Sequence, residues 1–244
     1  MPRLLRALFL LFVIPALGMP APAAGASIAD QWITGLKEID QKLRSQQWQE
    51  AAEQSRKVAE QMVTRGVRDK DVAYSLAVVS VFRALAEKGR GDDDAADWYC
   101  DLALNLVPEI GKTDLKPYGT VGAAIKPKLL KSLQTDPKPP LEPGSPDEGQ
   151  PKDVTRPVVR KQVKPEYPAG LSEEGVAGRV VAETIIDVDG RPKHCRILDT
   201  QGGGPAMKYA ALDALREWRF DPARRDGKPV KVYYVLTINF TFRK

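Results

Sequence analysis

The sequence predicts a multidomain protein, with an all-α N-terminal part and a small α+β C-terminal domain built on a three-stranded antiparallel sheet with a helix. Apolar residues recur every three or four positions from about residue 28 to residue 133, which is the spacing of helices with one buried face. Near the C-terminus, apolar and polar residues alternate as in half-buried strands. Between these parts, residues 134–158 are rich in proline and charge, which predicts an extended linker.

The N-terminus has the layout of a secretory signal peptide. Arg3 and Arg6 accompany a short apolar stretch, and the small residues 21–26 follow it. We expect cleavage after Ala26 and a periplasmic mature protein. The alternative is an uncleaved membrane anchor, which would contact the inner membrane. That reading needs about 20 consecutive apolar residues, and Pro15 interrupts a shorter run.

The helical part divides into two helical hairpins. The first helix carries Trp32 to Leu43 on one face, and the second begins at Trp48. A third runs over 70–88, and a fourth ends near Leu106, with an N-cap offered by residues Asp92 to Asp94 at its start. Beyond these, glycines and prolines predict that no long helix forms over 115–133, with at most a short one at 126–133; the breakers are Pro117, Gly119, Gly122 and Pro127.

The C-terminal domain is predicted to alternate strands and helices. The expected order is a short helix at 169–174, strands at 179–188 and 192–200 joined by Asp189-Gly190, a helix from about Pro205, and a last strand from Val230 to Phe242. Three strands and one main helix form a small two-layer domain.

Catalytic chemistry has little support in this sequence. The chain has one histidine, His194, so no histidine-based metal cluster can form within it. His194 and Cys195 are neighbours on a strand and should point to opposite faces, which argues against a shared metal or a Cys-His nucleophile. The cysteines Cys100 and Cys195 are either two separate buried thiols or, after export, one disulfide. We expect no enzyme activity, no cofactor and no metal.

The net charge of +5 is modest and lies mostly in the C-terminal part. A basic domain in an envelope compartment suits acidic protein segments or anionic surfaces. Export argues against nucleic acid as a partner.

Several motifs follow one another in the C-terminal third, from about Val163. They are Tyr167-Pro168, Gly178 at a strand start, Asp187 and Gly190 at a hairpin, Trp218, Phe220 and Pro222 in one run, and Gly227 before the last strand. In this order they resemble the periplasmic C-terminal domain of the TonB energy transducers. The resemblance implies that domain's fold and its protein-binding function. We expect these motif residues to be core and turn residues.

Two fragments of the helical part resemble tetratricopeptide repeats. Residues 47–52 resemble the turn-aromatic-x-x-Ala element, and residues 95–108 resemble the end of a repeat. The alternative is an unrelated helical bundle, which leaves the all-α class unchanged.

The last strand is the candidate binding site. If it lies at a sheet edge, its unpaired backbone groups can accept an extended peptide as an added strand. The resemblance implies that an outer-membrane receptor segment pairs there, beside the stretch before the Tyr-Pro pair. The partner-binding residues would be Val163, Lys164, Pro165 and Glu166, together with the strand's outer face of Lys231, Tyr233, Val235, Thr237, Asn239 and Thr241. Alternatively, the strand serves only the fold or pairs with a second copy in a homodimer.

These inferences predict a signal peptide (1–26), a tetratricopeptide-like domain (27–133), a linker (134–158) and a TonB-like domain (159–244). Such a protein would bind a segment of an outer-membrane receptor or another envelope protein, in TonB-dependent transport. One alternative is a membrane-anchored transducer of proton-motive force; another is an envelope scaffold without a transport role. The short N-terminal segment without histidine, and a helical domain in place of most of a long spacer, put force transmission in question.

Overall fold

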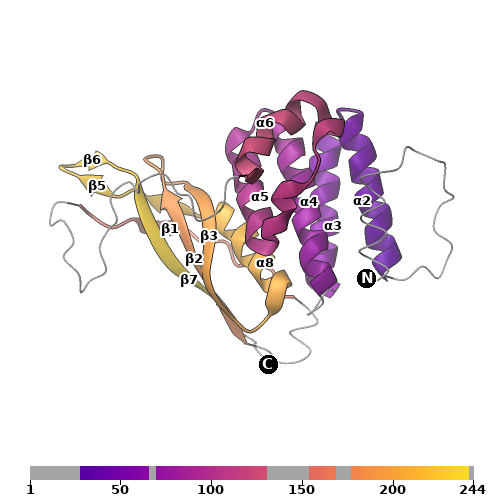
Figure 1. The fold of residues 1–244 in the computed structure, drawn as a ribbon. Coiled ribbons are helices and arrows are strands. Elements are labelled where there is room, and N and C mark those ends of the chain that lie inside the picture. Colours follow the sequence, from indigo (N-terminus) through magenta and orange to yellow (C-terminus); the bar gives the residue numbers. More distant parts are fainter. Residues whose placement is uncertain (1–27, 66–69, 131–153, 169–176, 242–244) are drawn as a thin grey trace.

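The computed structural model describes residues 28–65, 70–130, 154–168 and 177–241. Its helical half and its sheet half lie side by side in Figure 1, and the predicted fold class is confirmed. The expected signal peptide, most of the expected linker and the expected helix at 169–174 lie outside the described residues.

The four main helices of the N-terminal half form where the apolar spacing predicts them. They are α2 (Ile28–Arg44), α3 (Trp48–Arg65), α4 (Lys70–Gly89) and α5 (Asp93–Leu106). The carboxylate of Asp92 accepts a hydrogen bond from the Ala95 amide at 2.9 Å, which confirms the expected N-cap of α5. Every residue of α4 from Leu76 to Phe82 is buried, because this central helix contacts neighbours on several sides.

The segment after α5 is more regular than the sequence suggested. It forms η1 (Pro108–Lys112), η2 (Lys116–Tyr118) and the helix α6 (Gly119–Leu130), which continues through Gly122 and Pro127. A Cβ on Gly122 would lie 2.1 Å from the carbonyl oxygen of Leu115, so this glycine permits a close approach and does not end the helix. Pro127 is exposed near the end of α6, where the loss of one backbone hydrogen bond is tolerated.

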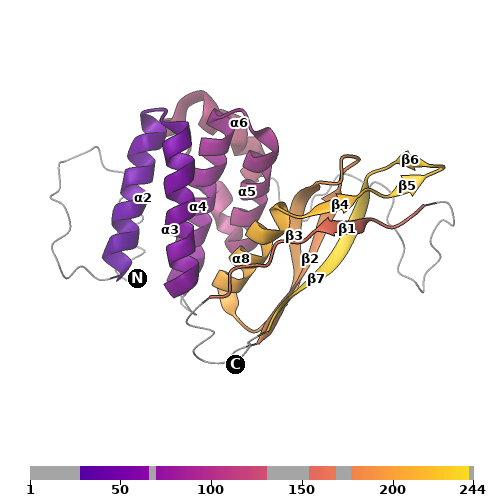
Figure 2. The same ribbon diagram turned by 180° about the vertical axis from the view of Figure 1, so that it is seen from behind.

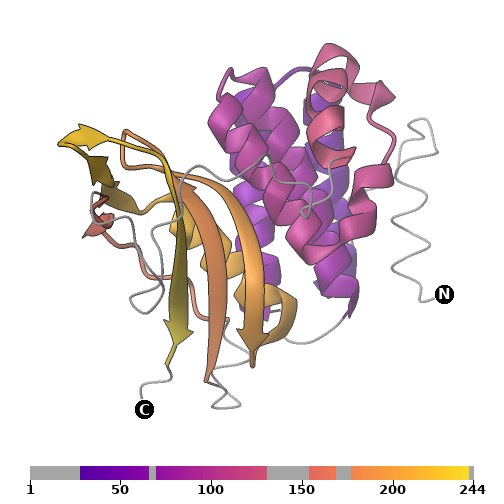
Figure 3. The ribbon, with the colours of Figure 1, turned by 60° about the vertical axis from the view of Figure 1, so that its left-hand side comes forward.

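The C-terminal sheet has the strand order β3-β2-β7 and is antiparallel throughout. Its strands are β2 (Gly178–Ile186), β3 (Pro192–Gln201) and β7 (Val232–Phe240). The helix α8 (Gly204–Arg216) packs on β2 and β3, and alternate residues of β2 from Val180 to Ile186 are buried. Figure 3 shows β3 on the side of the sheet nearest the helices and β7, in yellow, on the far side.

Two short strand pairs were not predicted. The strand β1 (Val158–Lys161) pairs with β4 (Arg219–Asp221), and β5 (Arg224–Arg225) pairs with β6 (Lys228–Pro229). Asp226 and Gly227 between β5 and β6 have φ values of 50° and 76°, as a two-residue hairpin turn requires. Val154 forms a bridge with Arg225, so the last residues of the predicted linker pair with the C-terminal domain.

The two halves pack directly against each other, whereas the predicted linker suggested two separated domains. The helix α8 contacts α3, α4 and α5, and α5 also contacts β3. Figure 2 shows α8 between the helical half and the sheet. Buried residues of both halves belong to one continuous hydrophobic core. Amphipathic spacing predicted that α8 buries one face, but it could not show that α8 also has the helical half as a neighbour.

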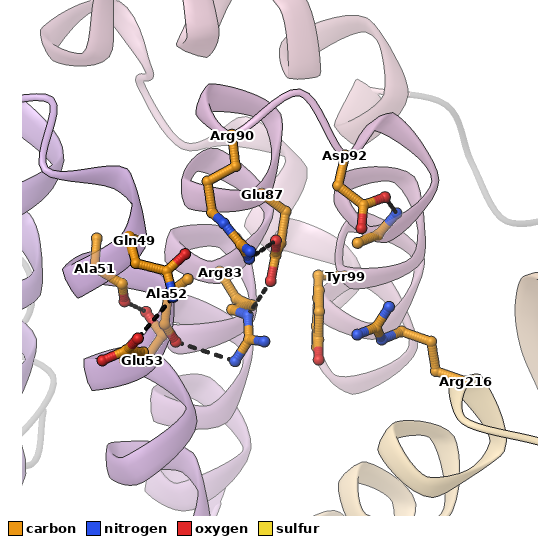
Figure 4. A network of polar contacts seen from close by, with 12 residues as sticks. Gln49, Ala51, Ala52, Glu53, Arg83, Glu87, Arg90, Asp92, Tyr99 and Arg216 are labelled. Atoms are coloured by element: carbon orange, nitrogen blue, oxygen red, sulfur yellow. Dashed lines mark hydrogen bonds and ion pairs between the residues drawn. The ribbon is translucent and has the colours of Figure 1, made fainter.

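A polar network reinforces this junction (Figure 4). The ring of Tyr99 lies between the guanidinium groups of Arg83 and Arg216, whose Cζ atoms are 5.1 and 5.5 Å from its centroid. The Tyr99 hydroxyl donates to Asp213 Oδ1 at 3.0 Å. Arg83 also pairs at 2.6 Å with Glu87, whose side chain is 2% exposed. The network therefore ties α4 and α5 to α8.

Candidate functional site

The strand β7 is an edge strand, as the binding-site hypothesis requires. It pairs with β2 through nine consecutive residue pairs, from Gly178–Phe240 to Ile186–Val232, without a register shift. Within the described part of the chain, no strand pairs with its other side. A regular edge of this kind presents a row of backbone donors and acceptors to an incoming strand.

The outer face of β7 is largely accessible. Val235 is 53% exposed, and the other exposed positions of the predicted face are Lys231, Thr237, Asn239 and Thr241. Lys231 Nζ lies 3.3 Å from Asp187 Oδ1. Tyr233 differs from the prediction, because only 9% of it is exposed. It therefore offers little surface to a partner.

The stretch Val163–Glu166 lies on the helix side of the sheet, away from the outer face of β7. Its residues Val163, Lys164 and Glu166 line a cavity of about 180 Å³ together with residues of α3 and α8, among them Val63 and Tyr209. The Val163 carbonyl accepts a hydrogen bond from Trp218 Nε1 at 2.9 Å, and Glu166 Oε1 accepts one from the Thr64 hydroxyl at 3.0 Å. The sequence could not show this, because part of the wall of the cavity comes from α3 in the helical half.

The two predicted groups of binding residues approach each other through Tyr167. Its ring meets that of Phe240, at the end of β7, edge-on with a centroid distance of 6.0 Å. Tyr167 thus connects the stretch 163–166 to β7, and Pro168 after it is buried.

Several of the remaining motif residues occupy core and turn positions, whereas Pro222 is half-buried and lies outside a turn. Gly190 has a φ of 75°, and a Cβ there would lie 1.9 Å from the carbonyl oxygen of Phe220, whose amide donates to the Gly190 carbonyl at 2.9 Å. A Cβ on Gly178 would lie 2.6 Å from Met207 Sδ of α8. Trp218 and Phe220 are buried.

His194 and Cys195 do not follow strict strand alternation. His194 has a φ of 55° and lies in a bulge, so both side chains reach α5. His194 Nδ1 lies 3.0 Å from Asp101 Oδ2, and Cys195 Sγ lies 4.0 Å from the carbonyl oxygen of Trp98. The two side chains therefore do not point to opposite faces as predicted, and of the two His194 is exposed and Cys195 is buried.

The two cysteines are buried and free. Burial raises the pKa of both the Cys100 and the Cys195 thiol, so neither is a reactive thiolate at neutral pH. In the described ranges, no group of three His, Cys, Asp or Glu side chains is placed to hold a metal ion. Within the same ranges, none of the helices has the length and apolar character needed to cross a membrane.

The polar residues of α5 that face the sheet were not predicted from the sequence. Asn105 donates from Nδ2 to the Cys195 carbonyl and accepts at Oδ1 from the Ile197 amide, both at 2.8 Å. The sequence feature that could have indicated this contact is the polar side chain of Asn105, which stands between Leu104 and Leu106 on an otherwise apolar part of the helix.

Three comparisons with known proteins concern the C-terminal part. Residues 163–242 match the family model of the Gram-negative bacterial TonB protein C-terminal domain. The Protein TonB of Vibrio cholerae serotype O1 is 32% identical over 83 residues, which cover 34% of this chain and 34% of that protein. The chain thus spans about a third of the length of this relative. The solution NMR structure of the Pseudomonas aeruginosa TonB CTD is 25% identical, with a TM-score of 0.28 over 38% of this chain and 88% of that one.

Proposed function

We propose that this protein has a TonB-like role in TonB-dependent transport, because residues 163–242 match the TonB C-terminal domain family. It binds an extended segment of an outer-membrane receptor or other envelope protein, which adds as a strand to β7. The observation that carries this proposal is the uninterrupted nine-residue register of β7 on β2, with no described strand on its other side. Added strands gain affinity from main-chain hydrogen bonds and specificity from alternate side chains.

The exposed side chains of β7 provide the specificity in this proposal. Val235, Thr237 and Asn239 lie on the outer face, where a bound segment's side chains would lie beside them. The stretch Val163–Glu166 acts indirectly, because its contacts with α3 and Trp218 hold Tyr167 against Phe240 at the end of the acceptor strand.

Photo-crosslinking in intact cells tests this function. A photoreactive amino acid replaces Thr237 on β7 or, as the matched control, Leu198 on β3, which is 47% exposed. We expect the Thr237 position to form an adduct with an outer-membrane protein, the Leu198 position to form none, and the substitution Val235→Lys to weaken the adduct. Adducts with a second copy alone would support the homodimer instead, and equal adducts from both positions would contradict a specific acceptor strand.

The location of the protein separates a periplasmic binding module from an anchored transducer. We propose that the chain is cleaved after Ala26 and acts in the periplasm, since its N-terminal layout fits a signal peptide. Intact mass after cell fractionation tests this. A soluble periplasmic species that starts near Ser27 is expected, whereas a species in the inner membrane that retains Pro2 would favour the transducer.

A further inference from the structure

The outer edge of β3 lies against one stripe of α5. Residues of α5 at successive spacings of four, three and four contact this strand between Lys193 and Ile197. Asp94 forms an ion pair with Lys193, the Trp98 carbonyl contacts Cys195 Sγ, and Asp101 contacts His194. At the end of the stripe, Asn105 contacts the backbone itself.

The carboxamide of Asn105 replaces a missing neighbouring strand. It donates to the Cys195 carbonyl and accepts from the Ile197 amide, each at 2.8 Å. A residue of a parallel strand would offer the same pair, one donor and one acceptor, to positions two apart. A further hydrogen bond from Nδ2 to the Asp101 carbonyl, at 2.9 Å, fixes the side chain on α5. These two backbone groups of β3 are therefore occupied, and an incoming strand cannot use them.

The two edges of the sheet differ in a second respect. The β2–β3 pairing shifts register twice, between Val181 and Ala182 and between Glu183 and Ile185, whereas the β2–β7 pairing does not shift. Bulges and side chains that cover an edge are the features by which proteins prevent unwanted strand pairing. Among the described residues, the sheet therefore has one irregular, covered edge at β3 and one regular edge at β7 with which no described strand pairs.

The structure assigns to α5 the role of a cap on the β3 edge, in which the Asn105 side chain occupies backbone groups of the strand. This cap leaves β7 as the single acceptor edge of the three-stranded sheet. The inference rests on the proposed function for what β7 accepts, but the cap can be tested without any partner. One open edge limits self-pairing to a closed dimer, while two open edges permit an open chain of many copies. The helical half thus keeps the acceptor sheet from polymerising.

Hydrogen exchange of the full purified chain, followed by NMR, tests the cap at one atom. In Asn105→Ala the Ile197 amide loses its acceptor, and we expect its exchange to accelerate about fivefold to tenfold, as for the loss of one hydrogen bond. Asn105→Asp keeps an acceptor oxygen, so the Ile197 amide should stay within about twofold of the parent rate. Asp97→Ala, at an exposed site on the same helix, is the matched control and should change nothing. Equal acceleration in all three variants would indicate general destabilisation and overturn the cap.

Analytical ultracentrifugation tests the consequence for assembly. The parent chain and Asp97→Ala should not exceed a dimer, and Asn105→Ala should form larger, concentration-dependent species. Faster exchange at Ile197 without species larger than a dimer would refute the claim that the cap limits the sheet to one edge. Failure of the β7 crosslink would refute the proposed function alone, because the exchange at Ile197 requires no partner.

Discussion

The hydrogen bond between Tyr99 and Asp213 makes the docking of the two halves measurable. Tyr99→Phe removes the hydroxyl that donates to Asp213 Oδ1 at 3.0 Å and keeps the ring between Arg83 and Arg216. A hydrogen bond to a charged group contributes about 1.5 to 3 kcal/mol. We therefore expect the free energy of unfolding at pH 7 to fall by about this amount. For a chain of this size, that loss lowers Tm by roughly 3 to 12 °C.

The loss should depend on pH. Burial raises the pKa of Asp213, and the hydrogen bond from Tyr99 opposes that rise, so its removal raises the pKa further. A carboxyl whose pKa is higher in the folded than in the unfolded chain reduces stability as pH rises through the folded pKa. The deficit of Tyr99→Phe should consequently be smaller near pH 4 than at pH 7.

Urea unfolding of the parent and the variant at both pH values is the assay, with Tyr74→Phe as the control. Tyr74 is half-buried on α4, and its substitution should change stability by no more than about 0.5 kcal/mol. Equal stabilities of the Tyr99→Phe and Tyr74→Phe variants at pH 7 would refute the reasoning. A pH-independent deficit would refute the part that concerns Asp213.

Two further predictions concern the backbone and the thiols. Gly190→Ala should lower the free energy of unfolding in urea by about 2 kcal/mol or more, since its Cβ would lie 1.9 Å from the Phe220 carbonyl oxygen. Gly227→Ala is the control, because Gly227 has a similar φ and nothing within 4 Å, and it should lower this free energy by about 1 kcal/mol. Equal losses in the two variants would show that the clash is not the cause. Cys100 and Cys195 should resist a thiol reagent at pH 8 until the protein unfolds, because both are buried with raised pKa values; rapid labelling of the native chain would contradict this.

Much of the fold follows from local patterns in the sequence. The helices α2 to α5 and the three main strands lie close to their predicted positions, because apolar spacing reports which face of an element is buried. The hairpin at Gly190 likewise carried its own signal in Asp189-Gly190. The turn at Asp226-Gly227 carried the same dipeptide, and its short strands escaped notice because each has only two residues.

The arrangement of the two halves could not be predicted in this way. Burial patterns do not identify the partner of a buried face, and the contacts that join the halves connect residues far apart in the sequence, such as Tyr99 with Asp213 and Asn105 with Cys195. The position of Val163–Glu166 depends on the same junction, since α3 supplies part of the cavity that this stretch lines. The sequence could not predict that β7 lies at the edge of the sheet, because apolar and polar residues alternate in the same way in central and edge strands. The binding-site hypothesis therefore had to assume the edge position.

The most direct test of strand addition is hydrogen exchange on β7 with and without a synthetic peptide of the receptor segment captured at Thr237. In an antiparallel ladder, alternate residues direct their backbone groups toward opposite neighbours. The account predicts that every second amide from Val232 to Phe240 slows about tenfold or more on binding, while the amides of β3 do not change. Slower exchange on β3 or in the helical half, without the alternating pattern on β7, would contradict it.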